Sequence, residues 1–200
     1  MKLLYLPAFY KKLKRGPQVI TPKDIGIIIS YTGIGKDSFC VDAGTGSGWL
    51  AVSLARVSKK VVSYELREDF KKIAEKNKII ANVDNLEIKL SDVLKGIKEK
   101  DVDLITLDLP NSEKAVKYAN KSLKEGGYLV GYLPNTEQVK RFMMKMEHYN
   151  FTDMLTIEVI VRDILVRKEG VRPSTKGIWH TAYLVFGRKH TNSEKVNKKI

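Results

Sequence analysis

The sequence predicts an α/β fold in which helices cover both faces of a doubly wound, mostly parallel sheet. Three observations support this prediction. Apolar runs rich in β-branched residues alternate with segments of helical periodicity through most of the chain. A glycine turn, Asp42–Gly48 (DAGTGSG), directly follows the first apolar run. The last third then changes to two β-rich runs with only a loop between them, which would close the sheet with an antiparallel pair.

Seven strands are expected. The run Val102–Leu107 is of the sort that is buried on both faces of a parallel sheet. In chain order the expected strands are Ser38–Ala43, Lys60–Glu65, Leu86–Leu90, Val102–Leu107, Tyr128–Leu133, Leu155–Val161 and Thr181–Gly187.

Five helices should connect or cover these strands. Glu68–Ile80 has its lysines facing outward and its apolar residues at helical spacing. The amphipathic segment Ser112–Leu123 should end at Gly126-Gly127, because glycine is favoured at helix ends. In chain order the expected helices are Thr21–Tyr31, Gly48–Arg56, Glu68–Ile80, Ser112–Leu123 and Thr136–Met146.

Length and composition limit the class of protein. The 200 residues fit one domain, and no apolar run approaches the ~20 residues of a membrane span. Cys40 is the only cysteine and no His/Cys/Asp cluster has metal-ligand spacing, so we expect a cytoplasmic protein without disulfides or metal. Lys and Arg outnumber Asp and Glu by 36 to 23, a formal charge of +13. That excess favours either a polyanionic partner or the lysine-rich surface of a heat-adapted protein.

The residues of the glycine turn indicate which cofactor it holds. Glycines let the backbone approach a ligand closely, but Trp49 stands where dinucleotide-binding turns have their third glycine. Asp42 precedes the glycines, and a carboxylate there would repel a pyrophosphate but attract an amine or a sulfonium. S-adenosylmethionine carries both of these cations.

Two more acids follow the next two strands. Glu65 ends the second strand, where a carboxylate can bind ribose hydroxyls, and Ser91-Asp92 ends the third, where it can meet the adenine amino group. Three acids at successive strand ends favour S-adenosylmethionine as the cofactor. The alternative is that the glycines only make a tight turn and the acids only cap helices.

The chain from Arg15 to Lys189 resembles the Rossmann-like tRNA (adenine-N1)-methyltransferases of the TrmI type, which modify the T-loop. The likeness is carried by GPQVITPKD (Gly16–Asp24), VDAGTGSGWL (Val41–Leu50), SYELRED (Ser63–Asp69), DLITLDLP (Asp103–Pro110), YLPNTEQV (Tyr132–Val139) and HTAYLVF (His180–Phe186). The resemblance implies a class I S-adenosylmethionine-dependent methyltransferase fold, a homotetramer, and tRNA as the partner that is methylated at N1 of adenine 58 or 57.

The resemblance also implies roles for individual residues. Gln18 and Pro22–Asp24 would lie over the cofactor, and the glycine turn would wrap its methionine part. The expected cofactor-binding residues are Gln18, Asp42, Gly44, Thr45, Gly46, Ser47, Gly48, Glu65, Leu66, Asp92, Val93 and Asp108.

Asp108 is the expected catalytic residue. It follows an otherwise apolar strand at the sheet edge where ligands of such folds bind. A carboxylate that accepts a hydrogen bond from the adenine 6-amino group would push electron density toward N1 and stabilise the charge developing on the ring. The alternative is that Asp108 is a helix cap or a turn residue before Pro110.

Three features depart from the family pattern. Asn111-Ser112-Glu113 stands where family members carry a proline-tryptophan pair, and Thr21 stands where they often have tyrosine. Most of the family's N-terminal β-domain is missing from this chain. We therefore divide it into a basic, aromatic segment (1–15), the methyltransferase domain (16–189) and a disordered basic tail (190–200).

Further residues are open to two interpretations. The residues that could contact RNA or form an ordinary solvated surface are Tyr5, Phe9, Tyr10, Lys11, Lys12, Lys14, Arg15, Arg162, Arg167, Lys168, Arg172 and Lys176. His180 is expected to be structural, and Trp49 and Trp179 to belong either to the core or to a base pocket.

Two rival functions remain. A small-molecule methyltransferase of the precorrin type shares the fold and approximate length. The missing β-domain and the altered segment after Asp108 favour it. The formal charge of +13 and the motifs YLPNTEQV and HTAYLVF oppose it. A catalytically silent RNA-binding module is a further alternative, which the intact set of acids opposes.

Overall fold

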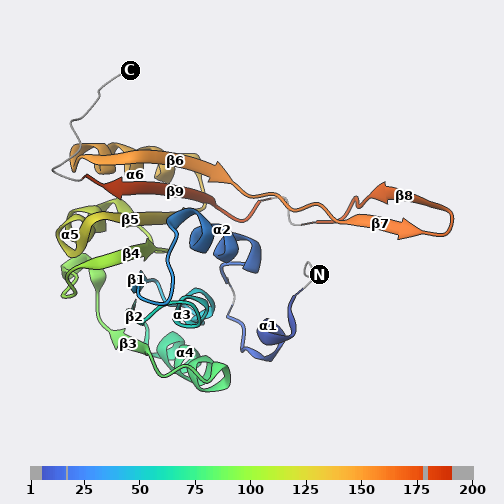
Figure 1. Cartoon of the computed structure of the whole chain (residues 1–200), viewed down its shortest axis with the longest axis horizontal. Helices are drawn as coiled ribbons and strands as arrows, with labels where there is room; N and C mark the ends of the chain where they lie inside the picture. Colours follow the sequence, from blue (N-terminus) through green and yellow to red (C-terminus); the bar gives the residue numbers. More distant parts are fainter. Residues whose placement is uncertain (1–5, 17, 178–179, 191–200) are drawn as a thin grey trace.

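The computed structural model describes residues 6–16, 18–177 and 180–190, and Figure 1 shows how its elements are arranged. Its main sheet has the order β3-β2-β1-β4-β5-β9-β6. Strands β1 to β5 are parallel, and β9 is antiparallel to both of its neighbours, which confirms the predicted sheet. The strands are β1 (Phe39–Ala43), β2 (Lys60–Glu65), β3 (Leu86–Leu90), β4 (Val102–Leu107), β5 (Leu123–Leu133), β6 (Phe151–Glu158) and β9 (Tyr183–Lys189).

Helices cover both faces of this sheet (Figure 1). Side chains of β1 alternate between the faces, so that Cys40 joins the buried cluster on one side and Val41 the cluster on the other. The first face carries α1 (Ala8–Lys12), α2 (Pro22–Thr32), α3 (Trp49–Ala55) and α4 (Glu68–Ala81). The second carries the 3-10 turns η1 (Val93–Lys95) and η2 (Ser112–Ala115), with α5 (Val116–Ser122) and α6 (Thr136–His148).

The glycine pair Gly126-Gly127 does not end a helix, contrary to the prediction. Helix α5 ends at Ser122 and β5 begins at once, so both glycines lie inside the strand. Gly126 has a φ of 74°, and a Cβ on Gly127 would lie 2.8 Å from the carbonyl oxygen of Val102. The two glycines therefore permit a local irregularity in the strand pairing, where β5 passes close to β4.

The segment predicted as a loop after β6 is a β-hairpin. Strand β6 runs from Phe151 to Glu158, earlier than the expected Leu155–Val161, because Asn150 at φ 56° turns the chain directly after α6. Strands β7 (Ile164–Arg167) and β8 (Gly170–Pro173) then pair antiparallel. Figure 1 shows this hairpin projecting from the body of the domain.

The described part of the N-terminal segment packs on the domain. The ring of Tyr10 lies 5.2 Å from that of Trp49, and its hydroxyl is 2.8 Å from Ser53 Oγ on α3. The boundaries at residues 16 and 190 stay predictions, and the expected tail lies outside the described residues except for His190. Among the described residues, no helix has both the length and the apolar character needed to cross a bilayer.

Candidate active site

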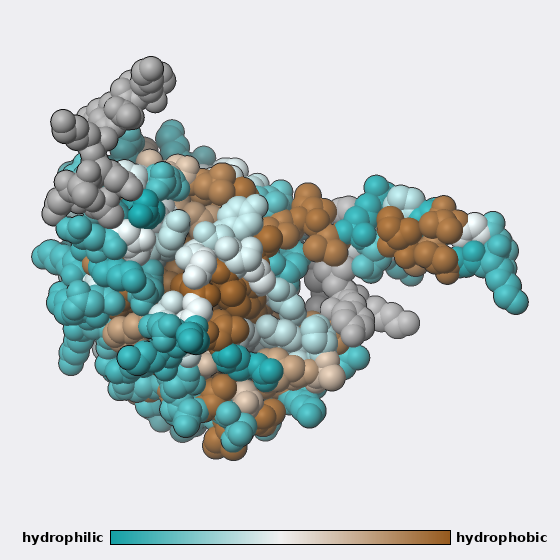
Figure 2. Space-filling model, viewed as in Figure 1, coloured by the Kyte–Doolittle hydropathy of each residue, from teal (hydrophilic) through white to brown (hydrophobic). Residues whose placement is uncertain are grey.

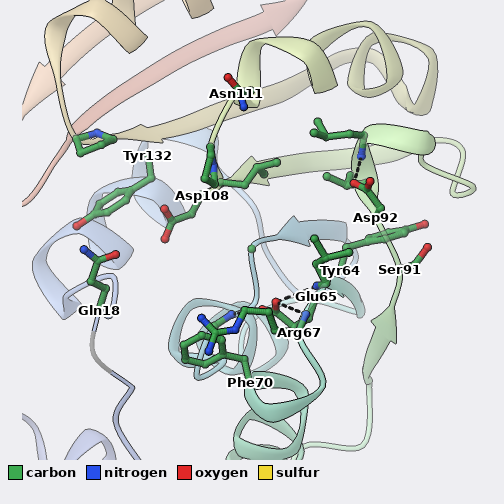
Figure 3. Close-up of a pocket in the computed structure, with 18 of the residues that line it drawn as sticks. Gln18, Tyr64, Glu65, Arg67, Phe70, Ser91, Asp92, Asp108, Asn111 and Tyr132 are labelled. Atoms are coloured by element: carbon green, nitrogen blue, oxygen red, sulfur yellow. Dashed lines mark hydrogen bonds between the residues drawn. The ribbon is translucent and has the colours of Figure 1, made fainter.

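A cavity of about 780 Å³ opens at the carboxyl ends of the parallel strands. Ligands of doubly wound sheets bind at this edge, and the volume suits a cofactor. Figure 3 shows Gln18, Tyr132 and Asp108 on one side of the cavity and Ser91 and Asp92 opposite them. Glu65, at the end of β2, lies below with Arg67 and Phe70.

The glycine turn is shaped by two close approaches of the backbone. Gly44 has a φ of 89°, and a Cβ there would lie 1.9 Å from the carbonyl oxygen of Asp108. Gly48 has a φ of 80°, and its Cβ would lie 3.0 Å from the Cβ of Ala74 on α4. Gly44 thus lets the end of β4 reach the turn, and Gly48 lets α3 pack on α4, while Gly44 and Gly46 line the cavity.

Glu65 is the predicted ribose-binding acid, and it lies on the cavity wall. Its Oε2 accepts a hydrogen bond of 2.8 Å from the Gly46 N–H, and its Oε1 accepts from the N–H groups of Leu66 and Arg67 at 2.8 and 2.9 Å. The carboxylate therefore fixes the glycine turn to the end of β2. Oε1 uses both of its lone pairs on these two N–H groups, whereas Oε2 keeps one lone pair for a ligand hydroxyl.

Asp92 and its neighbours form the opposite wall. Asp92 Oδ1 caps η1 by accepting a hydrogen bond of 2.8 Å from the Leu94 N–H. Ser91, Val93 and the 69% exposed Leu66 also line the cavity. The predicted adenine-binding residues thus come together in one place.

Asp42 is not on the cavity wall, contrary to the expected contact with the cofactor. It is 2% exposed, and its oxygens accept hydrogen bonds from Ser63 Oγ at 2.6 Å and Thr106 Oγ1 at 2.7 Å. Ser63 and Thr106 are its partners in register on β2 and β4. Burial raises the pKa of Asp42, which its two hydroxyl donors oppose. The carboxylate lies beneath the site and acts on it through its charge.

Asp108 lies half-buried on the wall directly after β4. Its backbone N–H donates to the carbonyl oxygen of Ala43 at 2.8 Å, which holds the residue beside the glycine turn. Burial raises its pKa to about 7, and the nearby charges of Asp42 and Glu65 act in the same direction. A carboxyl with this pKa changes its protonation state near neutral pH, as acid–base chemistry requires.

The two hydroxyl-bearing residues of the glycine turn, Thr45 and Ser47, are both buried. Thr45 Oγ1 lies 2.6 Å from Ser63 Oγ. Ser47 Oγ is buried without a hydrogen-bond partner among the described residues, and it borders a side cavity of about 30 Å³ that shares Gln18, Gly44 and Asp108 with the main one. An unsatisfied buried hydroxyl beside a cavity is suited to a polar ligand group.

Gln18 lies on the cavity wall as expected, but Lys23 and Asp24 do not lie over the cavity. Asp24 is fully buried and bound to Lys23 Nζ at 2.7 Å. Lys23 Nζ also donates to the carbonyl oxygen of Val159 and to Thr181 Oγ1, at 2.7 and 2.8 Å. This buried ion pair joins α2 to the chain directly after β6 and to the chain directly before β9, so its role is structural.

The sequence prediction missed Tyr132 among the wall residues. Burial raises its pKa, with Asp24 and Asp108 adding to the effect, and its side chain is hydrogen-bonded to Thr181 and Asp24. The motif YLPNTEQV could have indicated it, because Tyr132, Pro134 and Gln138 all line the cavity. Other wall residues that were not predicted are Tyr64, Arg67, Phe70, Leu94, Leu109, Pro110 and Asn111.

Several of the ambiguous residues have structural places. Trp49 is 4% exposed and belongs to the core, while Trp179 and Tyr5 lie outside the described residues. Phe9 and Tyr10 pack on Arg56 and Trp49, so they are not free to stack on bases. His180 bridges Glu158, at 2.5 Å, and the carbonyl oxygen of Pro134, at 3.1 Å, in agreement with a structural role.

No group of three His, Cys, Asp or Glu side chains in the described parts of the chain could hold a metal ion.

Comparison with known proteins decides the family. Residues 8–182 match the family described as "tRNA methyltransferase complex GCD14 subunit". The chain belongs to this family. It is 40% identical over 208 residues to the tRNA (adenine(57)-N(1)/adenine(58)-N(1))-methyltransferase TrmI of Methanocaldococcus jannaschii, covering 89% of this chain and 74% of that protein. The predicted resemblance is thereby confirmed.

Solved structures agree on the class I methyltransferase fold. The tRNA (m1A58) methyltransferase TrmI of Aquifex aeolicus has a TM-score of 0.86 and 30% identity, over 94% of this chain and 78% of that one. A protein described as a SAM-dependent O-methyltransferase from Thermotoga maritima has a TM-score of 0.88 and 31% identity, over 94% and 74%. The precorrin 8w decarboxylase of Methanobacterium thermoautotrophicum, with a TM-score of 0.75 and 17% identity over 88% and 97%, shares the fold alone.

Proposed function

We propose that this protein transfers a methyl group from S-adenosylmethionine to N1 of an adenine in the tRNA T-loop, at position 58 and, as a second candidate, position 57. The observation that carries the proposal is the position of Asp108, on the wall of an acidic cavity at the carboxyl ends of the strands. Membership in a tRNA methyltransferase family supports the same conclusion, as do the activities for which the relatives are named.

The residues of the cavity fit the proposed cofactor. Glu65 and Asp92 can accept hydrogen bonds from ribose hydroxyls and from an adenine amino group. The Ser47 hydroxyl can take part in binding the methionine end, where the side cavity adjoins the main one. Asp108, with Asp42 beneath it, gives this end of the cavity the negative charge that an amine and a sulfonium require.

Asp108 would act on the target base. When bound, the cofactor supplies an electrophilic methyl group on a sulfonium sulfur. The Asp108 carboxylate would accept a hydrogen bond from the adenine 6-amino group, which raises the electron density at N1 and stabilises the positive ring that forms. It can also take up a proton from that amino group after transfer, because its pKa is about 7. The base must leave its stack to reach this position.

The direct test is to incubate the protein with labelled S-adenosylmethionine and bulk tRNA and to identify the modified nucleoside and its position by mass spectrometry. We expect N1-methyladenosine in the T-loop. Labelled tRNA that carries another modified nucleoside, or no label in tRNA, would contradict the proposal.

The precorrin-type alternative is favoured by the changed residues after Asp108, where Asn111 replaces the aromatic surface expected near a base. The two functions differ in their response to salt. Phosphate contacts release counterions, so tRNA affinity should fall about tenfold or more between 50 and 200 mM salt if several lysines are engaged. A flat response would favour the small-molecule substrate.

We propose that tRNA is held by the basic side chains around the hairpin β7–β8.

We also propose that the protein is a cytoplasmic homo-oligomer, a tetramer by its family resemblance. An isolated two-stranded hairpin is marginally stable in water. Its Val166 and Val171 are 76% and 66% exposed, and Figure 2 shows apolar side chains along the projecting arm. A second copy of the chain would cover these side chains.

The oligomer can be tested by light scattering of the Val166→Lys variant. We expect a smaller assembly than that of the unaltered protein, because a buried lysine would oppose the contact. Lys168→Ala in the turn of the same hairpin is the matched control and should leave the mass unchanged. An unchanged mass for Val166→Lys, or a monomeric parent protein, would overturn the assignment.

A further inference from the structure

Residues Leu6–Gly16, which we call the N-terminal strap, pack beside α3 and α4 (Figure 1). Leu13 is 6% exposed, and Tyr10 packs on Trp49 and contacts Ser53 through its hydroxyl. The strap is thereby attached to the two helices that follow the glycine turn and the end of β2.

One buried amide joins the strap to the glycine turn. Asn77 on α4 is fully buried, and its Oδ1 accepts a hydrogen bond of 2.7 Å from the Lys14 N–H. Its Nδ2 donates to the carbonyl oxygen of Lys14 at 2.7 Å and to that of Ser47 at 2.7 Å. Trp49 Nε1 donates to the same Lys14 oxygen at 3.0 Å. The side-chain amide of Asn77 therefore uses both of its N–H groups and its oxygen to hold two separate segments of backbone.

The chain beyond Lys14 reaches the cavity within a few residues. A Cβ on Gly16 would lie 3.2 Å from Phe70 Cε1 and 3.5 Å from Ser47 Cβ, so the strap passes in contact with the turn. Gln18 then lies on the cavity wall, and it lines the small side cavity together with Gly44 and Gly46. The strap and the glycine turn are thus joined by direct contacts.

We propose that Asn77 is a positioning residue that couples docking of the strap to occupation of the cofactor turn. This coupling rests on the proposed function, because it requires S-adenosylmethionine in this cavity. Asn77 touches no ligand itself. It holds the Ser47 carbonyl, and with it the turn, in the arrangement that the docked strap completes. Coupling of this kind is reciprocal, so cofactor binding tightens the strap by the factor by which the docked strap tightens cofactor binding.

The strap can be altered without touching Asn77 or the fold of α4. Lys14 is exposed, and only its backbone makes the two contacts with Asn77. Lys14→Pro removes the N–H that donates to Asn77 Oδ1, whereas Lys14→Ala removes the same side chain and keeps that N–H. Leu13 has the extended conformation that a following proline requires, with φ −75° and ψ 141°.

Calorimetry with S-adenosylmethionine should show that Lys14→Pro binds about tenfold more weakly than Lys14→Ala, whose affinity should match that of the unaltered protein. In the unaltered protein, the cofactor should slow hydrogen exchange of the Lys14 amide by about tenfold. The Tyr149 amide, which bonds to Lys145 and Met146 at the end of α6, should be unaffected.

Equal cofactor affinities for the two variants would overturn the coupling while leaving the proposed function intact. The same holds if the hydrogen-exchange rate of the Lys14 amide is unchanged by the cofactor. Failure of the unaltered protein to bind S-adenosylmethionine would overturn both. A structural role alone would lower the melting temperature of Lys14→Pro without the ligand-dependent change in exchange.

Discussion

The two halves of the cavity are held in different ways. At the ends of β2 and β3, Glu65 and Asp92 are fixed by backbone N–H groups, most of them one or two residues away. At the ends of β4 and β5, Tyr132 is hydrogen-bonded to Asp24 and Thr181, which are distant in sequence. The charges of Asp42 and Glu65 act on Asp108 and raise its pKa further. The first half is a binding surface held in place by local hydrogen bonds. The second half contains Asp108, whose pKa is raised to about 7. We infer that the first binds the cofactor and the second performs the chemistry.

The largest effect should come from Asp108→Asn. The amide keeps the shape of the carboxyl but cannot carry its charge or take up a proton, so kcat should fall by about 100-fold to 10,000-fold. Affinity for S-adenosylmethionine should fall by much less than kcat, because Asp42 keeps a negative charge beneath this end of the cavity. Calorimetry and single-turnover methylation measure the two quantities. Glu113→Gln, outside the cavity, is the matched control. An equal loss of affinity and rate in Asp108→Asn would show that Asp108 binds the cofactor instead of acting on the base.

The same variant should be more stable than the unaltered protein at neutral and alkaline pH. The pKa of Asp108 is higher in the folded state, about 7, than its ordinary 3.8, so its ionisation lowers stability as the pH rises from about 4 to 7. The substituted asparagine is not an acid and avoids this cost, for a gain of about 1–2 kcal/mol above pH 7. Chemical denaturation at pH 5 and pH 8 should show the gain growing with pH. A variant that is less stable at pH 8 would argue against the raised pKa.

A smaller effect is expected in the other half. Glu65→Gln keeps the size of the side chain but loses the charge that backbone N–H groups and a ribose would share, so the cofactor dissociation constant should rise about tenfold. Glu68→Gln on the exposed start of α4 is the control for removing one negative charge nearby. Unchanged affinity in Glu65→Gln would remove Glu65 from the proposed site.

The smallest effect concerns His180, beyond the second half. Its hydrogen bonds to Glu158 and to the Pro134 carbonyl raise its pKa. The stabilisation is present below the unfolded pKa of about 6.5 and is lost as the pH rises through the folded value. His180→Gln should therefore lower the melting temperature by about 1–2 °C at pH 5.5 and by less at pH 8.5. An equal change at both pH values would show that the imidazolium does not contribute.

The contrast between the two halves also explains what the sequence could predict. The residue ranges of the parallel strands, and the places of Glu65, Asp92 and Asp108 at strand ends, leave a pattern within a few residues of the chain and could be predicted. The sequence prediction placed Asp42 at the cofactor, because an acid at a strand end can face either a ligand or the neighbouring strands. In the structure it faces the hydroxyls of Ser63 and Thr106, which are in register with it on those strands.

Other elements could not be assigned from local patterns. The pair Lys23–Asp24 takes its place from Thr181, 157 residues after Asp24 in the chain. The hairpin β7–β8 was missed because its flanking charges suggested a loop, although Ile164, Leu165 and Val166 favour a strand.

The pH dependence of kcat/KM for methylation of tRNA tests the role of Asp108 most directly, because this ratio reports ionisations of the free enzyme. The ionised carboxylate is the active form, so the ratio should fall tenfold for each pH unit below an inflection near 7. The inflection should be missing from the residual activity of Asp108→Asn. A wild-type profile without this inflection, or the same inflection in both proteins, would contradict the assignment of Asp108 to the target base.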